Sequence, residues 1–300
     1  MNRRECIHTL NGLGLWSLTS GLSLNSDAVL KRTIPSSGEQ LPAVGLGTWQ
    51  TFDAGNSASE RDPLKDVLKN LIEKGGRVVD NSPMYGRSQG VVGELSTAAK
   101  LNEKLFIATK VWTTGRDSGI QQMNDAFELL KRKKIDLLQI HNLVDWQTHL
   151  KTLRALKEEG KIKYIGLTHY LDSMHDTLAD IISKEKVDFI QVNYNLLNRH
   201  AAERLLPFAQ EKGVAVIINR PFQEGALFDH VREKKLPAWA AEFDCHNWAQ
   251  FFLKFILSHP AVTCPIPGTS NPLHMLENIG AALGKLPDER QRQEMIKAVS

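Results

Sequence analysis

Short apolar runs alternate with longer stretches of helical spacing along most of this chain. The runs are rich in Val, Ile, Leu or Phe and have the length of a buried strand, roughly four to eight residues. We predict eight strands, at residues 43–46, 77–79, 105–109, 135–140, 162–167, 188–192, 214–218 and 262–266. Regular alternation of strand and helix is typical of a parallel sheet covered by helices. The predicted fold is therefore α/β, a parallel eight-stranded (β/α)₈ barrel of the TIM type.

Helical patterns separate these strands, and two further elements extend the barrel. We expect helices at residues 63–74, 119–132, 146–159, 174–185, 199–212, 238–258 and 272–283, with an extra surface helix at 287–299. Pro63 and Gly75 are start and stop signals for the first of these helices. Before the first strand, Ser36-Ser37-Gly38 separates two short extended runs. This pattern predicts a β-hairpin that caps the closed end of the barrel.

Polar residues follow three of the predicted strands at their carboxyl ends. Asp80 and Tyr85 come after one strand, Lys110 after the next, and His141 after the third. In a (β/α)₈ barrel this rim carries the catalytic groups, whereas the opposite rim serves stability. Each residue alone would more often be a turn, surface or packing residue. All of them at neighbouring strand ends predict an active site.

The same residues belong to a wider set of motifs. These are Gly45-Leu46-Gly47-Thr48-Trp49, the Asp80 to Tyr85 spacing followed by Gly86, the pair Thr109-Lys110, and Ile266-Pro267-Gly268-Thr269 with Glu277-Asn278. Together the motifs resemble the aldo-keto reductase family, over roughly residues 33 to 298. The resemblance implies a catalytic tetrad of Asp80, Tyr85, Lys110 and His141. It also implies NAD(P)H-dependent reduction of an aldehyde or ketone to an alcohol by hydride transfer.

Carbonyl reduction suits the chemistry of these side chains. Negative charge develops on the carbonyl oxygen as hydride arrives, so a proton donor and nearby positive charge are needed there. Tyr85 is the natural donor, and we expect the Lys110 ammonium to lower the pKa of its hydroxyl. We expect Asp80 to hold Lys110 in place. The resemblance gives His141 the role of orienting the carbonyl or relaying a proton.

The resemblance further implies a nucleotide site for NADPH, with NADH as the alternative. The residues at the matching positions are Thr48, Thr168, Gln191, Asn219, Arg220, Gly268, Thr269, His274, Glu277 and Asn278. Thr168 and Gln191 match residues that bond the nicotinamide carboxamide in relatives. Asn219 stands where relatives often stack a tyrosine on the nicotinamide, so we expect stacking to be lost or supplied by Arg220.

The adenosine and substrate ends of the site also carry signals. We expect free N–H groups at the start of the helix after Thr269 to bind a phosphate. Gly268 and His274 replace the lysine and arginine with which many relatives hold the 2′-phosphate, which predicts modest preference for NADPH over NADH. Trp49 and Trp112 match aromatic positions that line the substrate pocket in relatives. Aromatic walls favour a hydrophobic carbonyl substrate.

Composition narrows the remaining choices. A chain of 300 residues with 42% hydrophobic residues suits one barrel domain, which we place at residues 29–300. We find no apolar run long enough to span a membrane, and a dispersed net charge of +3 does not suggest nucleic-acid binding. The spacing of the three cysteines does not suggest a metal site. The expected partner is a small carbonyl compound, and the oligomeric state is open.

The first 28 residues differ from the rest of the chain. Arg3-Arg4 precedes a weakly apolar stretch, residues 10–22, and Ser26-Asp27-Ala28 offers small residues for cleavage. This pattern resembles a twin-arginine export signal and predicts a periplasmic protein, with a cytoplasmic protein carrying an N-terminal extension as the alternative. N-terminal sequencing after fractionation of the native host tests the signal, and a mature cytoplasmic chain that begins at Met1 would contradict it.

Two alternative functions are open at this stage. The first is a non-catalytic subunit that senses nucleotide on the same fold, because a fold does not fix a function. The intact set of four strand-end residues argues against it, and turnover on a panel of aldehydes would separate the two. The second is metal-assisted hydrolysis, for which the sequence offers no His, Asp or Glu cluster at ligand spacing.

Overall fold

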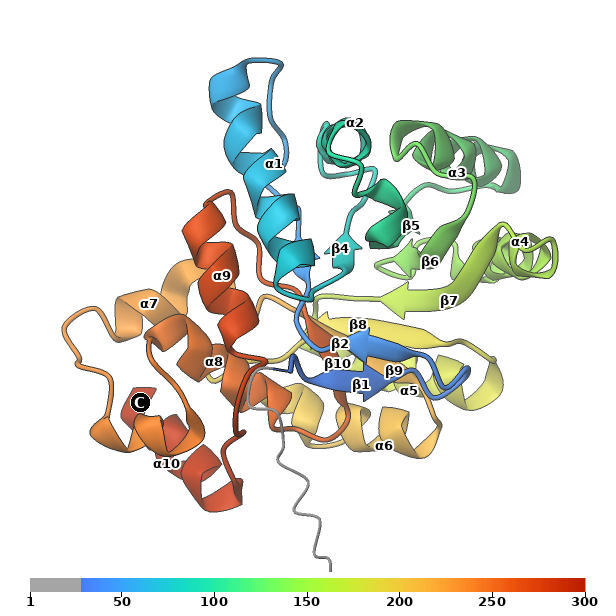
Figure 1. Ribbon diagram of the computed structural model, residues 1–300. Coiled ribbons are helices and arrows are strands. Elements are labelled where there is room, and N and C mark those ends of the chain that lie inside the picture. Colours follow the sequence, from blue (N-terminus) through green and yellow to red (C-terminus); the bar gives the residue numbers. More distant parts are fainter. Residues whose placement is uncertain (1–27, 300) are drawn as a thin grey trace, which may run out of the picture.

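The computed structural model describes residues 28–299, and these form a parallel barrel surrounded by helices (Figure 1). The predicted signal at residues 1–28 lies almost wholly outside the described residues and stays a prediction. Strands follow one another around the sheet in chain order, from β3 to β10, and every neighbouring pair is parallel. The prediction of an eight-stranded (β/α)₈ barrel is confirmed.

The strands are short and mostly buried along their whole length. They are β3 (Leu46–Gly47), β4 (Val78–Asp80), β5 (Phe106–Val111), β6 (Ile135–His141), β7 (Ile162–Thr168), β8 (Phe189–Asn193), β9 (Ala215–Asn219) and β10 (Val262–Pro265). Before them, β1 (Lys31–Thr33) and β2 (Gln40–Pro42) pair antiparallel as the predicted hairpin.

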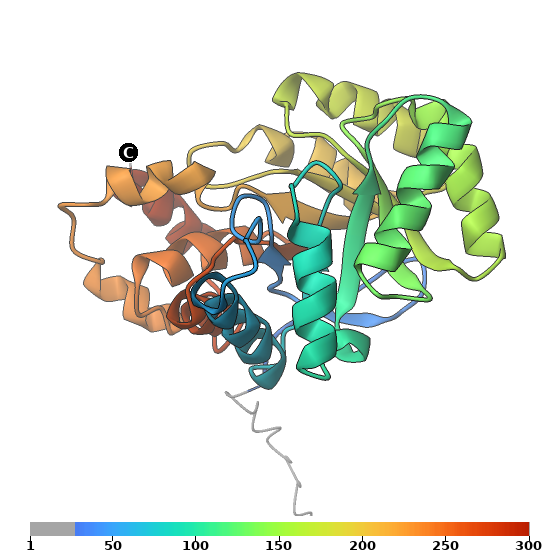
Figure 2. The same cartoon turned by 90° about the horizontal axis from the view of Figure 1, so that it is seen from above.

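Helices follow the strands and cover the outside of the sheet (Figure 2). They are α1 (Ala58–Glu73), α2 (Ser88–Ala98), α3 (Arg116–Leu129), α4 (Trp146–Glu158), α5 (His175–Lys184), α6 (Leu205–Glu211), α7 (Ala226–His230), α8 (Trp248–Leu257), α9 (Pro272–Gly280) and α10 (Glu289–Val299). Short 3₁₀ turns lie at Asn102–Lys104, Asp172–Met174, His200–Ala202, Gln223–Gly225 and Ala238–Phe243. Within the described residues, no helix is long and apolar enough to cross a membrane.

Backbone contacts between the first and last strands close the barrel. Gly45 N–H donates to Pro265 O at 3.0 Å, and Gly47 N–H donates to Pro267 O at 3.1 Å. Gly47 also pairs with Gly268 as an isolated parallel bridge. A Cβ on Gly47 would lie 2.7 Å from Ile266 O, so this close approach requires glycine. The Gly45 and Gly47 of the predicted motif therefore serve closure of the sheet.

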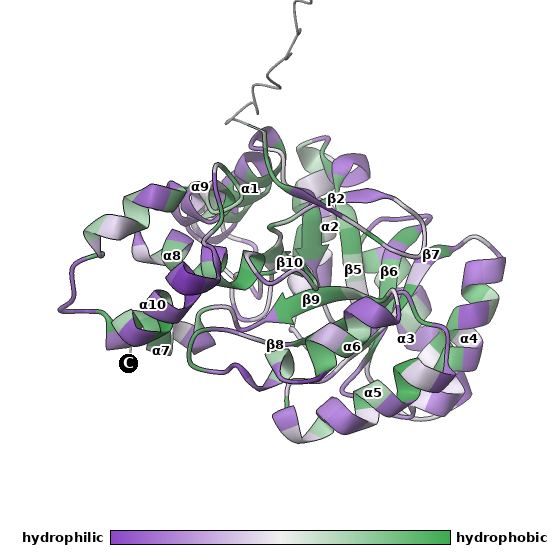
Figure 3. Cartoon of the chain, turned by 90° about the horizontal axis from the view of Figure 1, so that it is seen from below, coloured by the Kyte–Doolittle hydropathy of each residue, from purple (hydrophilic) through white to green (hydrophobic). Residues whose placement is uncertain are grey.

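The core has an inner and an outer layer. Phe106, Tyr164 and Phe189 fill the inside of the barrel and contact one another with ring centroids 5.5–6.2 Å apart. Ile34 and Leu41 of the hairpin region pack into the same inner cluster and close one end. Aliphatic and aromatic residues between strands and helices form the outer layer. Viewed from below, the strands are mainly green and the helices carry purple outer segments, as two-sided burial of the sheet requires (Figure 3).

Several predicted helix boundaries are wrong. Helix α1 begins at Ala58 instead of Pro63, because Ser57 caps it by accepting the Glu60 N–H and donating to the Glu60 carboxylate. The predicted helix at 238–258 is interrupted, because Asp244 adopts a left-handed conformation with φ of 55°. Asn247 then caps a separate helix, α8.

The predicted helix at 199–212 is also shorter in the structure. A 3₁₀ turn at His200–Ala202 comes first, and α6 occupies only Leu205–Glu211. The connection that follows β9 contains the short helix α7. Figures 1 and 2 both show α7, α8 and α10 grouped on one flank of the barrel, away from α3 and α4.

Candidate active site

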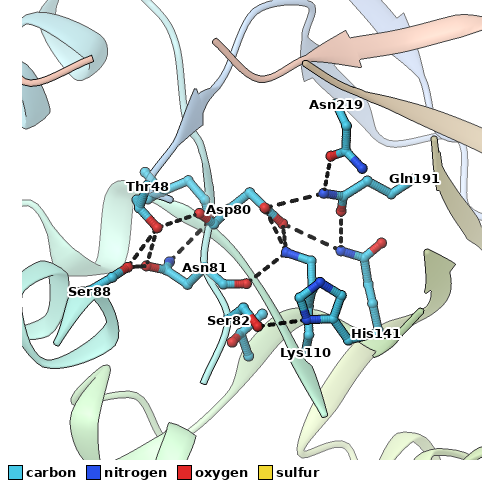
Figure 4. A network of polar contacts seen from close by, with 12 residues as sticks. Thr48, Asp80, Asn81, Ser82, Ser88, Lys110, His141, Gln191 and Asn219 are labelled. Carbon is cyan, nitrogen blue, oxygen red and sulfur yellow. Dashed lines mark hydrogen bonds and ion pairs between the residues drawn. The ribbon is translucent and has the colours of Figure 1, made fainter. Parts of the chain in front are cut away.

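Asp80 and Lys110 form a buried ion pair at the carboxyl end of the barrel. Asp80 is the last residue of β4, and Lys110 lies near the end of the neighbouring strand β5. Lys110 Nζ donates to Asp80 Oδ1 at 2.7 Å and to Oδ2 at 2.6 Å, and to Asn81 O at 2.8 Å (Figure 4). The exposed fractions of the two side chains are 0% for Lys110 and 2% for Asp80. The ammonium thus has three short contacts in place of water.

Burial and mutual attraction act against each other on this pair. Burial raises the pKa of Asp80 and lowers the pKa of Lys110, because each charged form loses its hydration. The contact between them opposes both changes. The bidentate contact and the carbonyl acceptor favour the ionised pair. The predicted role of Asp80 in holding Lys110 agrees with this geometry.

Amide side chains surround the Asp80 carboxylate on the side away from Lys110. Gln191 Nε2 donates to Asp80 Oδ2 at 3.2 Å, and Gln139 Nε2 lies 3.5 Å from Asp80 Oδ1. Gln139 also donates to Gln191 Oε1, and Gln191 Nε2 donates to Asn219 Oδ1 at 2.6 Å. A chain of amides from β6, β8 and β9 therefore supports the carboxylate across the barrel (Figure 4).

Tyr85 lies in the loop between β4 and α2, above Lys110. Lys110 Nζ is 5.0 Å from the centroid of the Tyr85 ring. The pKa of Tyr85 is raised well above its ordinary value, first by burial and then by the Asp80 charge, while Arg220 opposes the rise. Our expectation that the Lys110 ammonium lowers this pKa is wrong for the structure. Asp80 touches the ammonium directly and offsets its field at the phenol.

His141, the last residue of β6, completes the set. Its Nδ1 lies 2.9 Å from Ser82 Oγ, and its ring meets Tyr85 edge-on with centroids 5.9 Å apart. Burial, followed by the charge of Lys110, lowers the pKa of His141 to about 3. The imidazole is therefore neutral at physiological pH. Trp112 lies beside it at 6.3 Å between centroids and is 43% exposed, as a wall of a substrate pocket would be.

The structure brings the four predicted catalytic residues together, and the nicotinamide-side residues lie on the same rim. Thr168 ends β7 and is paired in register with Gln191. Arg220 follows Asn219 with φ of 45°, pairs with Glu224 at 3.0 Å, and lies 4.9 Å from the Tyr170 ring centroid. Arg220 therefore already stacks on an aromatic side chain of the protein.

Thr48 and Trp49 occupy the first βα loop. The Thr48 hydroxyl donates to Asp80 O at 2.8 Å and lies 2.6 Å from Ser88 Oγ, so it supports the backbone around the ion pair. This contact is internal, and cofactor binding by Thr48 stays a prediction. Trp49 is 39% exposed, and its role in substrate binding likewise stays a prediction.

The predicted adenosine-side residues gather around the start of α9. Gly268 and His274 are exposed, as is Glu277, whereas Thr269 and Asn278 are buried. Fewer backbone N–H groups are free at the start of α9 than we predicted. Asn271 Oδ1 caps the Leu273 N–H at 2.9 Å, Thr269 Oγ1 accepts the Asn271 N–H at 3.0 Å, and Pro272 has no N–H to offer. A phosphate would meet fewer backbone donors there than the sequence suggests.

Sequence reasoning missed several residues of this site. Asn81 and Ser82 follow Asp80 directly, and both contact the predicted catalytic residues. Gln139 was missed although it interrupts an apolar strand two positions before His141. Because side chains alternate along a strand, Gln139 and His141 share one face of β6. A polar residue on the inward face of a buried strand was the signal that could have identified Gln139 as part of the site.

The chain is similar to known proteins over most of its length. A family model described as the aldo/keto reductase family matches residues 43–295. Methylglyoxal reductase of Escherichia coli strain K12 is 28% identical over 256 residues, which cover 83% of this chain and 88% of that protein. Glyoxal reductase of Bacillus subtilis strain 168 is 28% identical over 245 residues, covering 79% and 82%. An aldo-keto reductase from Klebsiella pneumoniae, crystallised with NADPH, superposes with a TM-score of 0.74 at 23% identity over 89% of this chain and 95% of that one.

Replacing Lys110 with methionine tests the ion pair directly. Lys110→Met keeps the length of the side chain but leaves the buried Asp80 carboxylate without its cation. We expect the free energy of unfolding in urea to fall by about 3 kcal/mol at pH 7. The double variant Asp80→Asn with Lys110→Met should be more stable than Lys110→Met alone, because no unpaired charge then remains in the barrel.

The loss of stability in Lys110→Met should depend on pH in one direction. Without Lys110, burial holds the folded-state pKa of Asp80 above its unfolded value of about 3.9. A raised folded pKa favours folding only when the carboxyl is protonated, so the deficit of Lys110→Met should shrink as the pH falls towards 4. An equal deficit at pH 4.5 and pH 7, or a double variant no more stable than the single one, would argue against a buried charge pair.

Proposed function

Because the chain belongs to the aldo/keto reductase family and is an NAD(P)-dependent oxidoreductase, we propose that it reduces a small aldehyde or ketone with NADPH and that Tyr85 donates the proton. The observation that carries this proposal is the buried Asp80–Lys110 pair beneath the Tyr85 ring, with a neutral His141 beside it. Hydrolytic and metal-dependent chemistry has less support, because residues 28–299 contain no cluster of His, Cys, Asp and Glu that could hold a metal ion.

Tyr85 is suited to deliver a proton at neutral pH. Its raised pKa keeps the hydroxyl protonated in the resting protein. Bound NADPH would supply the hydride for the new C–H bond, and Tyr85 would give its O–H proton to the carbonyl oxygen to complete the alcohol. The Arg220 charge, which opposes the rise in the pKa of Tyr85, favours the phenolate that remains until solvent returns a proton.

The residues on the rim fit a nicotinamide carboxamide. Asn193 Oδ1 is buried without a hydrogen-bond partner, while its Nδ2 donates to Tyr170 O at 2.6 Å. This unpaired acceptor suits the NH₂ group of a carboxamide. We infer that Thr168 and Asn193 would hold the carboxamide, since the Gln191 amide is fully buried in its contacts with Asp80, Gln139 and Asn219.

The adenosine end fits a nucleotide less tightly. Asn278 is 2% exposed, and no hydrogen bond to its side-chain amide is present among the described residues. Gly268 is exposed and offers no cation at the position where many relatives carry a lysine. We therefore infer a modest preference for NADPH over NADH.

Two relatives suggest the class of substrate to assay first. Their names state reduction of methylglyoxal and of glyoxal, which are small dicarbonyl compounds. Trp112 would form one wall of the pocket, next to His141. We propose a small reactive aldehyde or ketone as substrate, and the two dicarbonyls are the starting point of the panel.

Tyr85→Phe tests the proton donor while keeping the ring. We expect kcat for methylglyoxal reduction to fall by roughly 10²-fold or more, with NADPH affinity nearly unchanged. Tyr164→Phe is the matched control, because its hydroxyl contacts Ser37 and Glu39 at the hairpin end of the barrel, and kcat should be retained. Wild-type turnover in Tyr85→Phe would remove Tyr85 from the mechanism. NADPH binding with negligible turnover by the wild type on the whole panel would favour a nucleotide sensor.

Gly268→Lys tests the basis of nucleotide preference. A Cβ at Gly268 would lie 3.3 Å from Gly47 O and 3.6 Å from Thr51 Cγ2, so a side chain fits with a small adjustment. A new charge-assisted contact to the 2′-phosphate should raise the NADPH-to-NADH affinity ratio by about 10-fold, measured by tryptophan fluorescence titration at pH 8. Gly268→Ala, which adds no charge, should leave the ratio unchanged. A wild type that already prefers NADPH several hundredfold would mean that another cation reaches the phosphate.

A further inference from the structure

Ser82 contacts the imidazole ring of His141. Ser82 is fully buried, and its Oγ lies 2.9 Å from His141 Nδ1 (Figure 4). Met84 N–H donates to the same oxygen at 3.4 Å. Among residues 28–299, the Ser82 hydroxyl makes these two hydrogen-bond contacts and no others. The group therefore has one backbone donor and one ring nitrogen as neighbours.

The donors and acceptors around the Ser82 hydroxyl determine whether it donates to His141 Nδ1 or accepts from it. A serine hydroxyl has one hydrogen and two lone pairs, and Met84 N–H already occupies one lone pair. A buried hydroxyl hydrogen without an acceptor costs free energy. His141 Nδ1 accepts that hydrogen only when Nδ1 itself carries no proton. The reverse arrangement, with Nδ1–H donating to Ser82, would leave the hydroxyl hydrogen without a partner among the described residues.

A neutral imidazole with a bare Nδ1 carries its proton on Nε2. Burial and the nearby Lys110 charge keep His141 neutral. No hydrogen bond to Nε2 is present among the described residues, so Nε2 is the ring nitrogen left for a ligand. We propose that Ser82 is a positioning residue that fixes His141 as the Nε2–H tautomer, so that the ring offers a donor to the carbonyl oxygen. The benefit to catalysis rests on the proposed function. The assignment of the tautomer rests only on the contact between Ser82 and His141.

The tautomer matters because the two forms have opposite effects on a carbonyl oxygen. With Nε2–H, His141 donates a hydrogen bond that strengthens as negative charge develops on the oxygen. With Nδ1–H, the Nε2 lone pair would face that oxygen and repel it. Ser82 thus determines whether His141 attracts or repels the carbonyl oxygen, although Ser82 itself does not contact the substrate.

Imidazole ¹⁵N NMR of the protein without cofactor or substrate reads the tautomer directly. We expect His141 to show a protonated Nε2 and an unprotonated Nδ1 between pH 6 and pH 8, with the signals assigned by their loss in His141→Phe. In Ser82→Ala the Nδ1–H form should become populated, and in Ser82→Thr, which keeps the hydroxyl, Nε2–H should persist. A wild type with the proton on Nδ1, or a tautomer unchanged in Ser82→Ala, would overturn the proposal.

Kinetics then measure the consequence for turnover. We expect Ser82→Ala to lower kcat about 10-fold with little change in NADPH affinity, and Ser82→Thr to recover most of the loss. Ser96→Ala is the matched control, because Ser96 is also fully buried and accepts a hydrogen bond from Asn102 Nδ2 at 2.9 Å, in α2. It should leave both the tautomer and kcat unchanged. An Nε2–H tautomer in a wild type without carbonyl reductase activity would contradict the proposed function and leave the tautomer assignment standing.

Discussion

A lysine ammonium buried inside a barrel is the constraint on which the rest of this site depends. Lys110 has no solvent around its charge, so the protein must replace hydration with Asp80 and the Asn81 carbonyl. Those partners must lie within hydrogen-bond distance of the ammonium. Neighbouring strands with a fixed register can hold them there. The pairing of β4 with β5 meets this requirement.

The same constraint shapes the groups around the pair. Asp80 needs further donors, and Gln139 and Gln191 supply them from β6 and β8. The field of the pair also reaches outward: Asp80 helps to keep Tyr85 protonated, and Lys110 helps to keep His141 neutral. A protonated phenol and an imidazole with its proton on Nε2 can both donate a hydrogen bond to an oxygen. Closure of the barrel by Gly45 and Gly47 holds this arrangement in place.

Strand positions and strand-end residues were predictable because they follow from apolar runs and barrel topology. The resemblance then assigned Asp80, Tyr85, Lys110 and His141, which the structure brings together. Hydrogen-bond direction and side-chain competition were not predictable. The sequence cannot show that Asn271 caps α9, or that Asp80 offsets the effect of Lys110 on the phenol. Both depend on distances between side chains that pattern and spacing do not set.

The ionisation state of Lys110 decides whether a charged pair lies inside the barrel. Selective ¹⁵N labelling of lysine and NMR of the Nζ group, assigned by its loss in Lys110→Met, would report that state in the free protein. We predict an ammonium at Lys110 throughout pH 6 to 8, held by Asp80. A neutral amine at pH 7 would contradict this prediction, because a neutral Lys110 beside a protonated Asp80 would leave no charged pair inside the barrel.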